Sequence, residues 1–441
     1  MASSSSPMDY SATNNSCNPW VERTAYVIDA TEVSHLQKGV DFARRHNIRL
    51  VVRNTGHDYL GRSTGAHSLA LWTHNLKSTG LLEYHDSKYV GPAIKLGAGV
   101  LVGKAIRFAN SHNPVVVGGN GPTVGIAGGF TQGGGIGPLS SIYGLSADQV
   151  LEWAVITADE KLVTANCTDN PDLYWALRGG GGGTPFYTAF KGFLTAQLLG
   201  LVDRGLYVVW VLTPALFYIN ARYAFGMYKG ELDELPQPTL SILTDAELQY
   251  AYNSFAAPTF LSAFETTPGS WNVFNHNAGG RLIPRSLLES DPDGLIAALR
   301  EIGMQALLTG VSFNVEVTKS SLSSAHEVAV NPYLRESIMK VFFGAPLDYQ
   351  YWDANLTGMD KITNYYLRGL ERLTPNGGAY LNEADVGQLD FLRVFHGDYY
   401  SRLAEIKQRY DPDGLYYAKT AVGSEKWEEK SNGRLCKAKG Q

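Results

Sequence analysis

The spacing of apolar and polar residues near the N-terminus predicts a strand, a helix and a second strand. Residues 24–30, Thr-Ala-Tyr-Val-Ile-Asp-Ala, form one extended run, and residues 49–54 form another around Leu-Val-Val. Between them Thr31 can cap a helix. The apolar positions of that helix recur with the helical period at Val33, Leu36, Val40 and Ala43. In such a unit we expect the two strands to lie side by side and parallel.

Further along the chain, the same pattern predicts two groups of short elements. In the first group we expect strands at 69–73, 93–96, 114–117 and 151–157, and helices at 101–111 and 173–177. From about residue 204, glycine becomes rarer and aromatic residues more frequent. There we expect strands at 207–212 and 307–317, and a helix at 293–302. An amphipathic helix is expected at 399–410, ended by the turn Asp-Pro-Asp-Gly at 411–414. The change at residue 204 indicates a second domain, whose sheet could roof a pocket.

Size and composition are those of an ordinary globular protein with two or three domains. The chain has 441 residues, 44% of them hydrophobic and 18% charged. Its net charge is −5 and it has no basic block, so we expect neither nucleic acid nor a membrane surface as a partner. We find no apolar run long enough to span a membrane and no signal peptide, which favours a cytoplasmic location. The three cysteines give no disulfide framework and no metal site. The oligomeric state is not indicated.

The loop from Arg53 to Gly65 carries the first candidate chemistry. It follows the apolar run Leu-Val-Val and contains Gly56 and Gly61, which let the backbone turn sharply and approach a ligand closely. Arg53 is a planar cation suited to phosphate oxygens. His57 supplies a ring nitrogen that is neutral, and therefore nucleophilic, near physiological pH. The loop therefore predicts an anion-binding site with a reactive group at its edge.

A second glycine-rich stretch covers residues 118–137, and five more glycines follow Arg178 at 179–183. So many glycines cannot pack a core of their own, and a flat ligand lying against backbone explains them better. The usual ligand motifs do not account for them. No Gly-x-Gly-x-x-Gly follows a strand, and the Walker A pattern fails around Lys104. Gly-x-Ser-x-Gly at 61–65 is followed by extended residues, whereas a nucleophile elbow requires a helix there. The histidine spacing fits no metal site.

Five motifs together resemble those of one family. They are Arg53-Asn-Thr-Gly-His-Asp-Tyr59, Gly121-Pro-Thr-Val-Gly125, Gly133-Gly-Gly135, Tyr143-Gly-Leu-Ser-Ala-Asp148 and Asp172-Leu-Tyr-Trp-Ala-Leu-Arg-Gly-Gly-Gly-Gly-Gly183. The C-terminal motifs Tyr380-Leu-Asn382, Tyr410-Asp-Pro412 and Thr420-Ala-Val-Gly-Ser-Glu-Lys-Trp427 agree with them. Over residues 24–436 the chain resembles the berberine-bridge-enzyme-like FAD-linked oxidases of the vanillyl-alcohol oxidase (PCMH-type) superfamily. The style is that of fungal members, many of which tailor secondary metabolites.

The resemblance implies an α+β fold with a PCMH-type FAD-binding domain of two subdomains. Residues 20–203 would form that domain, after a disordered tail at 1–19 that is rich in Ser and Asn. Residues 204–385 would form a substrate-binding domain, an antiparallel sheet flanked by helices. Residues 386–441 would be a C-terminal segment that returns to the FAD domain.

The resemblance also assigns residues to the site. His57 matches the histidine that bonds covalently to the 8α-methyl group of the flavin, and the surrounding backbone N–H groups would hold the diphosphate. The residues expected to bind the cofactor are Arg53, Asn54, Thr55, Gly56, His57, Asp58, Tyr59, Gly121, Thr123, Val124, Gly125, Gly128, Gly129, Gly135, Tyr143, Asp148 and Val155. The catalytic residues would be Tyr380, a base over the reactive face of the flavin, and Asn382. No metal is expected.

The reaction implied is oxidation of a small organic metabolite. Tyr380 would take a proton, a hydride would pass to flavin N5, and O2 would reoxidise the flavin with release of H2O2. Because a tyrosine begins near pKa 10, it needs a neighbouring cation or donor to act as a base at pH 7. Three alternatives stay open. They are a carbohydrate oxidase with an aromatic open groove, a flavin-holding cyclase without net redox turnover, and a degenerate binding protein.

Three departures from the family pattern bear on these expectations. Gly121 stands where many relatives have a second flavin-linking cysteine, so a single covalent link through His57 is expected. After Gly183 the chain lacks the family's Gly-Val-Val strand, and Cys17 lacks the partner cysteine that usually follows it. The last two leave open whether the flavin domain is competent. Nothing in residues 204–380 is diagnostic of a substrate.

Overall fold

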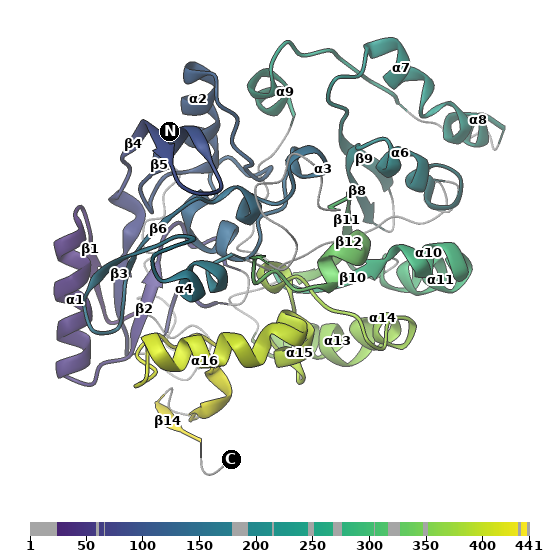
Figure 1. Cartoon of the computed structure of the whole chain (residues 1–441). Helices are drawn as coiled ribbons and strands as arrows, with labels where there is room; N and C mark the ends of the chain where they lie inside the picture. Colours follow the sequence, from purple (N-terminus) through teal and green to yellow (C-terminus); the bar gives the residue numbers. More distant parts are fainter. Residues whose placement is uncertain are drawn as a thin grey trace, which may run out of the picture.

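The N-terminal half, the middle of the chain and the C-terminal helices occupy different parts of the molecule (Figure 1). The described residues of this computed structural model are 24–58, 61–65, 67–178, 193–213, 216–245, 251–267, 276–303, 305–315, 327–346, 352–430 and 434–438. The elements before residue 179 lie on one side and most of those at 193–373 on the other. Helices α15 (Phe391–His396) and α16 (Tyr400–Tyr410) run below both. The predicted tail and the glycine run 179–183 lie outside the described residues.

A three-stranded parallel sheet begins the chain, with strands β1 (Tyr26–Asp29), β2 (Leu50–Arg53) and β3 (Leu69–Trp72) in the order β1-β3-β2. The predicted strands β1 and β2 are parallel, but the expectation that they lie side by side is wrong. β3 lies between them because it is the most apolar of the three and takes the most buried place. Helix α1 (Val33–Arg45) packs Val40 and Ala43 on this sheet. It begins after Glu32, without the predicted side-chain cap from Thr31.

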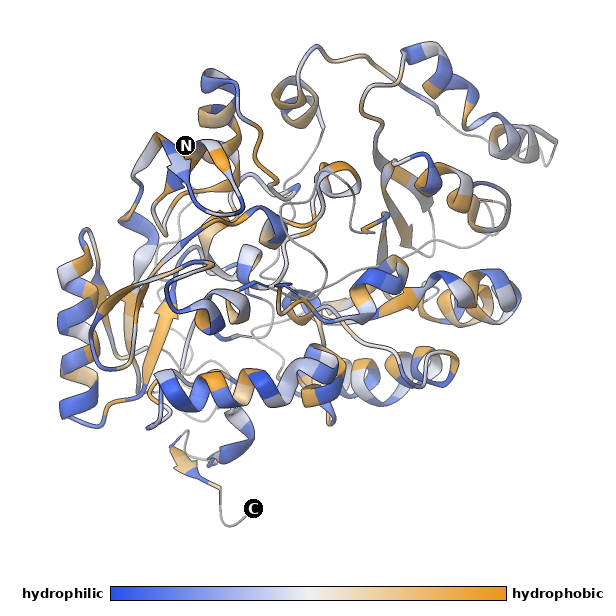
Figure 2. Ribbon diagram, viewed as in Figure 1, coloured by the Kyte–Doolittle hydropathy of each residue, from blue (hydrophilic) through white to orange (hydrophobic). Residues whose placement is uncertain are grey.

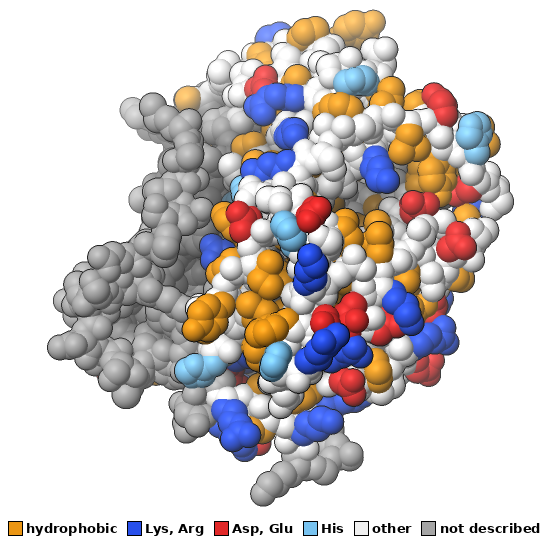
Figure 3. Space-filling view, turned by 90° about the vertical axis from the view of Figure 1, so that its left-hand side faces the viewer, with side chains coloured by type: hydrophobic (Ala, Val, Ile, Leu, Met, Phe, Trp, Pro, Cys, Tyr) orange, Lys and Arg blue, Asp and Glu red, His pale blue; other side chains and the backbone are white. Residues whose placement is uncertain are grey.

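The outer edge of this sheet is unusually open. Strand β1 leaves Tyr26 77% and Val27 54% exposed, and Phe42 on α1 is 49% exposed. Strand β1 and helix α1 lie on the side of the molecule that Figure 3 turns toward the viewer, where apolar side chains gather among basic and acidic ones.

Two antiparallel hairpins complete the N-terminal side. β4 (Thr79–His85) pairs with β5 (Val90–Leu96), and β6 (Trp153–Ile156) pairs with β7 (Leu162–Ala165). The short turn η1 (Thr73–Asn75) precedes them, and helices α2 (Val102–His112), α3 (Ser140–Tyr143) and α4 (Pro171–Ala176) and the short turns η2 (Ile126–Phe130) and η3 (Ser146–Gln149) lie between and after them. The strand expected at 114–117 is wrong, because this segment has no strand partner in the described part of the chain and leaves Val115 55% exposed. β-branched residues favour extended backbone, but a strand also requires a neighbour.

A five-stranded antiparallel sheet dominates the other side. Its order is β10-β12-β11-β8-β9, formed by β8 (Tyr207–Thr213), β9 (Leu216–Tyr223), β10 (His276–Pro284), β11 (Leu307–Ser312) and β12 (Ser337–Pro346). The remaining described helices and turns are η4 (Leu194–Leu198), α6 (Leu199–Asp203), α7 (Lys229–Glu234), α8 (Gln237–Asp245), α9 (Phe260–Thr266), α10 (Arg285–Ser290), α11 (Pro292–Gly303), α12 (Tyr333–Glu336), α13 (Trp352–Lys361), η7 (Ile362–Tyr366), α14 (Leu367–Leu373), η8 (Leu381–Glu383), η9 (Gly397–Tyr399) and η10 (Ser424–Lys426). No described helix is long and apolar enough to cross a membrane.

The two faces of this sheet have different partners, as the period of two along a strand requires. On β8, Trp210 and Leu212 face the helices, and Leu299 of α11 packs in the same cluster. Tyr207 and Val209 face the opposite way. There the sheet packs against Ile136, Leu145 and Ala147 of the N-terminal side and against Tyr380. Figure 2 shows the strands largely orange and the outer helices mixed blue and orange, which is the pattern of buried sheets under amphipathic helices.

The C-terminal segment lies against the N-terminal sheet. Tyr416 forms an isolated parallel bridge with Leu50 of β2, and its hydroxyl donates to the Ile156 carbonyl at 3.3 Å. Glu429, in the hairpin of β13 (Trp427–Glu429) and β14 (Leu435–Lys437), accepts from Arg49 at 2.8 Å. The domain boundaries given above stay a prediction.

His396 is a buried histidine at the end of α15. It is only 6% exposed, its Nε2 has no hydrogen-bond partner among the described residues, and its ring lies 5.7 Å from that of Tyr400. Burial, reinforced by the positive charge of Arg62, lowers the pKa of His396 to about 4.

This depressed pKa predicts a loss of stability in acid. Between pH 6.5 and pH 4 the unfolded chain binds a proton at His396 that the folded chain does not, so the free energy of unfolding falls as pH falls. A shift of this size corresponds to about 3 kcal/mol at most. Denaturant unfolding at pH 4, 5, 6 and 7 should show His396→Phe losing less stability than the wild type. The exposed His112, changed to Gln, serves as the control and should follow the wild type. If the free energy of unfolding fell equally with pH in the wild type and in His396→Phe, His396 would not be the cause of the acid destabilisation.

Candidate functional site

Three segments that are distant in sequence meet at one place, which we call the cradle. They are the turn 54–58 after β2, the glycine tract 118–137, and the segment 380–382. The five-stranded sheet covers the cradle with the face that carries Tyr207 and Val209.

The turn after β2 brings a histidine against the glycine tract. Gly56 has φ of 80°, a left-handed conformation that suits glycine, and so lets the chain reverse there. The next residue, His57, lies with Nε2 2.9 Å from the Thr123 hydroxyl oxygen. Burial lowers the pKa of His57 below its usual value, and a hydrogen bond with the Thr123 backbone opposes that shift. The ring is therefore neutral at pH 7 and available as a nucleophile.

Asn54 fixes the opposite wall of the same turn. Its Nδ2 donates to the Ala98 carbonyl at 2.7 Å. A Cβ on Gly125 would lie 2.2 Å from that nitrogen, and one on Gly128 3.3 Å, so both glycines let Asn54 approach the tract. The side-chain oxygen of Asn54, Oδ1, is buried and has no hydrogen-bond partner in the described structure. The Oδ1 atom of Asn120 is likewise buried and without a described partner. A buried acceptor without a partner is costly, which indicates that a ligand completes these groups.

Asn382 holds the far end of the tract. Its Nδ2 donates to the Gly129 carbonyl at 3.2 Å, and a Cβ on Gly133 would lie 2.0 Å from the same nitrogen. Gly129 itself is exposed, and a Cβ there would meet no described atom within 4 Å. Backbone at Gly129 is therefore open for contact with a ligand.

Tyr380 is the candidate acid–base group, and it is only 3% exposed. Its hydroxyl oxygen accepts from the Ile136 N–H at 3.4 Å, and the Lys340 ammonium lies 4.7 Å from the centre of its ring. Burial, with a further contribution from the Glu383 carboxylate, raises the pKa of Tyr380 well above its ordinary value, while Ile136 and Asn382 oppose this by donating to the oxygen. In the ligand-free chain the phenol is therefore protonated.

Lys340 is a residue that the sequence predictions missed. It lies on β12 facing the cradle, while its neighbours Met339 and Val341 face the helices. Its Nζ is 3.3 Å from both carboxylate oxygens of Glu383. Burial lowers the pKa of Lys340 and raises that of Glu383, and each charge opposes the shift of the other. The signal was present in the sequence, because Lys340 is the single charge in the apolar run Ile-Met-Lys-Val-Phe-Phe.

The structure gives several other predicted residues partners of their own. Asp58 accepts from the Arg62 backbone N–H at 2.6 Å and from Nε of the same residue at 2.8 Å, which closes the loop on itself. Asp148 forms an ion pair with Arg335.

Val155 packs in the apolar cluster of Ala165, Leu173 and Tyr174, on the hairpin β6–β7. Val124 packs with Val100 and Ile106, the Tyr143 carbonyl accepts from Gln149, and the Arg53 side chain folds over Gly56.

The remaining predicted positions follow the same segments. Thr55 lies half-buried in the turn, Gly121 lies within the tract beside Val124, and Gly135 has φ of 72° against Ser146. Tyr59 lies outside the described residues. The structure thus brings together Asn54, His57, Thr123, Gly125, Gly128, Gly129, Tyr380 and Asn382, while Asp148 and Val155 contact other groups. Their roles as ligands stay predictions.

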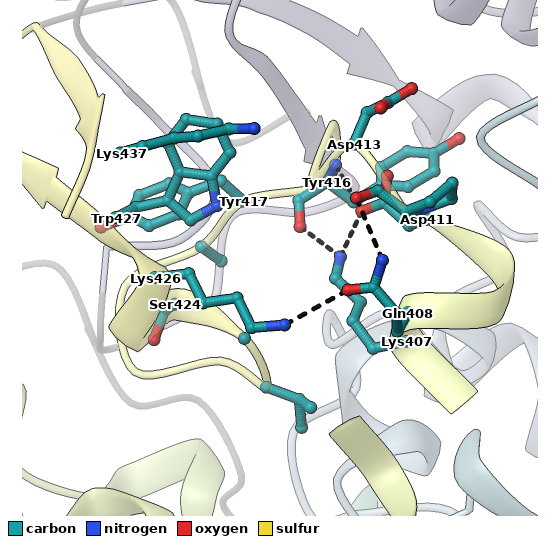
Figure 4. Close-up of a pocket in the computed structure, with 15 residues that line it drawn as sticks. Lys407, Gln408, Asp411, Asp413, Tyr416, Tyr417, Ser424, Lys426, Trp427 and Lys437 are labelled. Carbon is teal, nitrogen blue, oxygen red and sulfur yellow. Dashed lines mark hydrogen bonds and ion pairs between the residues drawn. The ribbon is translucent and has the colours of Figure 1, made fainter. Parts of the chain in front are cut away.

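A separate cleft of about 220 Å³ lies between the end of α16 and the hairpin β13–β14 (Figure 4). Its charged groups are largely occupied by each other. Lys407 donates to the Asp411 carboxylate and to the Tyr416 carbonyl, and Asp411 also accepts the Tyr416 N–H at 3.0 Å. Lys426 donates to Gln408 at 3.3 Å. We interpret this network as the support of the C-terminal turn, since none of the cradle residues lines the cleft.

Comparison with known proteins gives matches over the whole chain. Two family models match, one described as an FAD binding domain over residues 24–166 and one as berberine and berberine like over residues 379–423. The FAD-linked oxidoreductase sor8 of Hypocrea jecorina is 37% identical over 476 aligned residues, covering 99% of this chain and 82% of that protein. The bifunctional decalin synthase calF of Penicillium decumbens is 35% identical over 469 residues, covering 94% and 79%.

A solved structure is similar over nearly the same extent. The VAO-type flavoprotein MtVAO615 from Myceliophthora thermophila C1 superposes with a TM-score of 0.82 and 33% identity, covering 93% of this chain and 82% of that one.

The open backbone at Gly129 gives a direct test of the cradle. In Gly129→Ala the new Cβ meets no described atom, so the ligand-free stability should change by less than about 1 kcal/mol. If FAD lies on this backbone, its dissociation constant should rise about tenfold or more, measured in a His57→Ala background so that binding is reversible. Gly230→Ala on the exposed helix α7, also without a nearby atom, is the matched control; it should leave FAD binding unchanged and change stability by no more than about 1 kcal/mol. Unchanged FAD binding in Gly129→Ala would place the ligand elsewhere.

Proposed function

The chain belongs to the berberine-bridge-enzyme-like FAD-linked oxidoreductases of the vanillyl-alcohol oxidase superfamily, and on this premise we propose that it oxidises a small organic metabolite with FAD as the electron acceptor. The predicted α+β fold of the PCMH type and the oxidoreductase class are confirmed by these relatives. The observation that carries the proposal for the site is the meeting of His57, the glycine tract and Tyr380 in one cradle.

The residues of the cradle fit FAD. Buried acceptors at Asn54 and Asn120 lack partners among the described residues, and the exposed backbone at Gly129 can accept a flat ring against it. The turn after β2 offers backbone N–H groups to a diphosphate, as the loop sequence predicts. The neutral ring of His57 on the lip of the cradle is the group that would bond to the flavin.

We assign covalent attachment to His57 alone. Thr123, 2.9 Å from Nε2, holds the ring in place, and a held neutral imidazole is a better nucleophile than a mobile one. A second link is not proposed, because Gly121 has no side chain to supply it.

Tyr380 is proposed as the base that takes a proton from the substrate. When bound, FAD would supply the hydride acceptor, and O2 would take up the electrons and be reduced to H2O2. Burial keeps Tyr380 protonated in the ligand-free chain, so the site must stabilise the phenolate during turnover. The Ile136 N–H donates to the phenol oxygen, and Lys340 places a positive charge beneath the ring. Asn382 positions the tract through Gly129 and donates to the same phenol oxygen.

The substrate is proposed as a small molecule of secondary metabolism, on the names of fungal relatives rather than on any pocket residue. One alternative has an observation in its favour: a relative named a bifunctional decalin synthase is 35% identical over most of its length. In that case the flavin would be held while a ring closes, and O2 uptake would not match product formed. The carbohydrate oxidase alternative is tested by offering mono- and oligosaccharides in the same assay.

Attachment through His57 can be tested without knowing the substrate. Acid precipitation of the purified wild type should leave a yellow pellet, and His57→Ala should release all its FAD to the supernatant. Thr123→Val should retain a smaller covalent fraction, because the ring is no longer held. Complete release from the wild type would refute the link while leaving reversible FAD binding possible, and a protein without any FAD would favour the degenerate binding protein.

The role of Tyr380 is tested by the rate of flavin reduction under anaerobic conditions. Tyr380→Phe should bind FAD normally but reduce it about 10²–10⁴ times more slowly. Since the phenolate is the active form, the wild-type rate should rise with pH, and Lys340→Met should move that rise to higher pH. Tyr366→Phe, which changes a buried tyrosine packed on Phe343, is the matched control. If Tyr380→Phe reduced the flavin at the wild-type rate, Tyr380 would not be the base.

A further inference from the structure

We propose that Arg335 is a positioning residue: through its ion pair with Asp148 it fixes the Gly134–Ile136 backbone on which the cradle depends. Arg335 lies on α12, which leads into the five-stranded sheet, whereas Asp148 lies at the end of the turn 143–148 on the N-terminal side. The inference rests on the proposed function for its meaning, but its structural part can be tested in the ligand-free protein.

The ion pair is bidentate and buried. Arg335 Nη2 lies 2.7 Å from Asp148 Oδ1, and Nη1 lies 3.0 Å from Oδ2. Asp148 is 0% exposed, and the Arg335 side chain is 12% exposed. Nη1 also donates to the Val315 carbonyl at 3.3 Å. This planar fork geometry fixes direction as well as distance, which a lysine would not do.

Asp148 transmits this constraint to the turn that contains it. Its Oδ2 accepts the Leu145 N–H at 2.8 Å. The neighbouring amides of the turn then bond to the glycine tract, Ser146 N–H to the Gly135 carbonyl and Ala147 N–H to the Gly134 carbonyl, both at 2.9 Å. Together these bonds tie two glycines to a turn that is itself tied to Arg335.

The tied glycines lead directly to the proposed base. Ile136, the residue after Gly135, donates its N–H to the Tyr380 hydroxyl oxygen. Gly135 has φ of 72°, and a Cβ there would lie 2.6 Å from that of Ser146, so this backbone has little freedom to find the same place in another way. The path from Arg335 to Tyr380 therefore consists of described hydrogen bonds and two peptide units.

Asp148 was expected to contact the cofactor, but its two carboxylate oxygens are engaged with Arg335 and the turn. We therefore assign it an indirect role. A merely structural ion pair would stabilise the whole interface of sheet and tract equally. A positioning pair instead has its effect concentrated in the turn, the two glycines and the flavin environment.

Hydrogen exchange measures that difference directly. In Arg335→Met and in Asp148→Asn, the amides of Leu145, Ser146 and Ala147 should exchange on the order of tenfold faster than in the wild type, while those of Val209 and Trp210 on β8 keep their rates. Arg335→Lys keeps the charge but not the fork, and should restore part of the protection. Arg285→Met breaks an exposed ion pair with Asp203 and Glu289 and should leave all these amides unchanged.

A second readout concerns the flavin. In a His57→Ala background, Asp148→Asn should raise the dissociation constant for FAD on the order of tenfold and alter the visible absorption of the bound flavin. Equal acceleration of the turn and of β8 in every variant, Arg335→Lys included, would show a structural role only and overturn the proposal. Should Arg335→Met fail to fold, Arg335→Lys and Asp148→Asn decide by the same comparison. If the wild type binds no FAD, the proposed function fails, yet exchange in the ligand-free protein still decides the positioning role.

Discussion

The arrangement of the glycine tract 118–137 depends on what it is tied to, because glycine backbone without side chains has no core of its own and loses the most freedom on folding. The structure supplies those ties from several directions. Asn54 comes from the first parallel sheet, Asn382 from beyond the second sheet, and the turn 143–148 from the chain that follows the tract. A flexible segment held at many points can be shaped to a flat ligand more closely than one built on large side chains.

The five-stranded sheet makes this possible by serving two cores at once. Its helix-facing residues form a conventional apolar core, with Trp210 fully buried and its indole N–H bonded to Ser312 at 3.0 Å. The opposite face is also apolar but includes exceptions such as Tyr207 and Lys340. Buried polar groups of this kind are costly unless they have partners, and they gather where the sheet meets the cradle. The same strands thus pack the apolar core on one face and place polar side chains against the cradle on the other.

Much of this could be predicted from the sequence, and the reasons for the misses are physical. The helices at α1 and α11 and the strand β8 lie close to where periodicity placed them, since their apolar faces are long and regular. The segment 114–117 has strand-forming residues but no strand neighbour among the described residues, and the order β1-β3-β2 depends on a comparison of all three strands, which the pattern within one strand does not express. His57, Tyr380 and Asn382 were predicted through motifs, whereas Lys340 and Arg335 contact groups that lie far from them in sequence, and only the folded chain shows which group they face.

The contact between Asn382 and Gly129 joins residues that are 253 positions apart. A ribosome adding 5–20 residues per second needs roughly 13–50 s to make the second after the first. Until then, the histidine turn and the glycine tract exist without the wall that closes them. If the cradle holds FAD as proposed, the nascent protein passes through a stage at which it can meet FAD but cannot yet enclose it, and the order of synthesis puts completion of the cradle last.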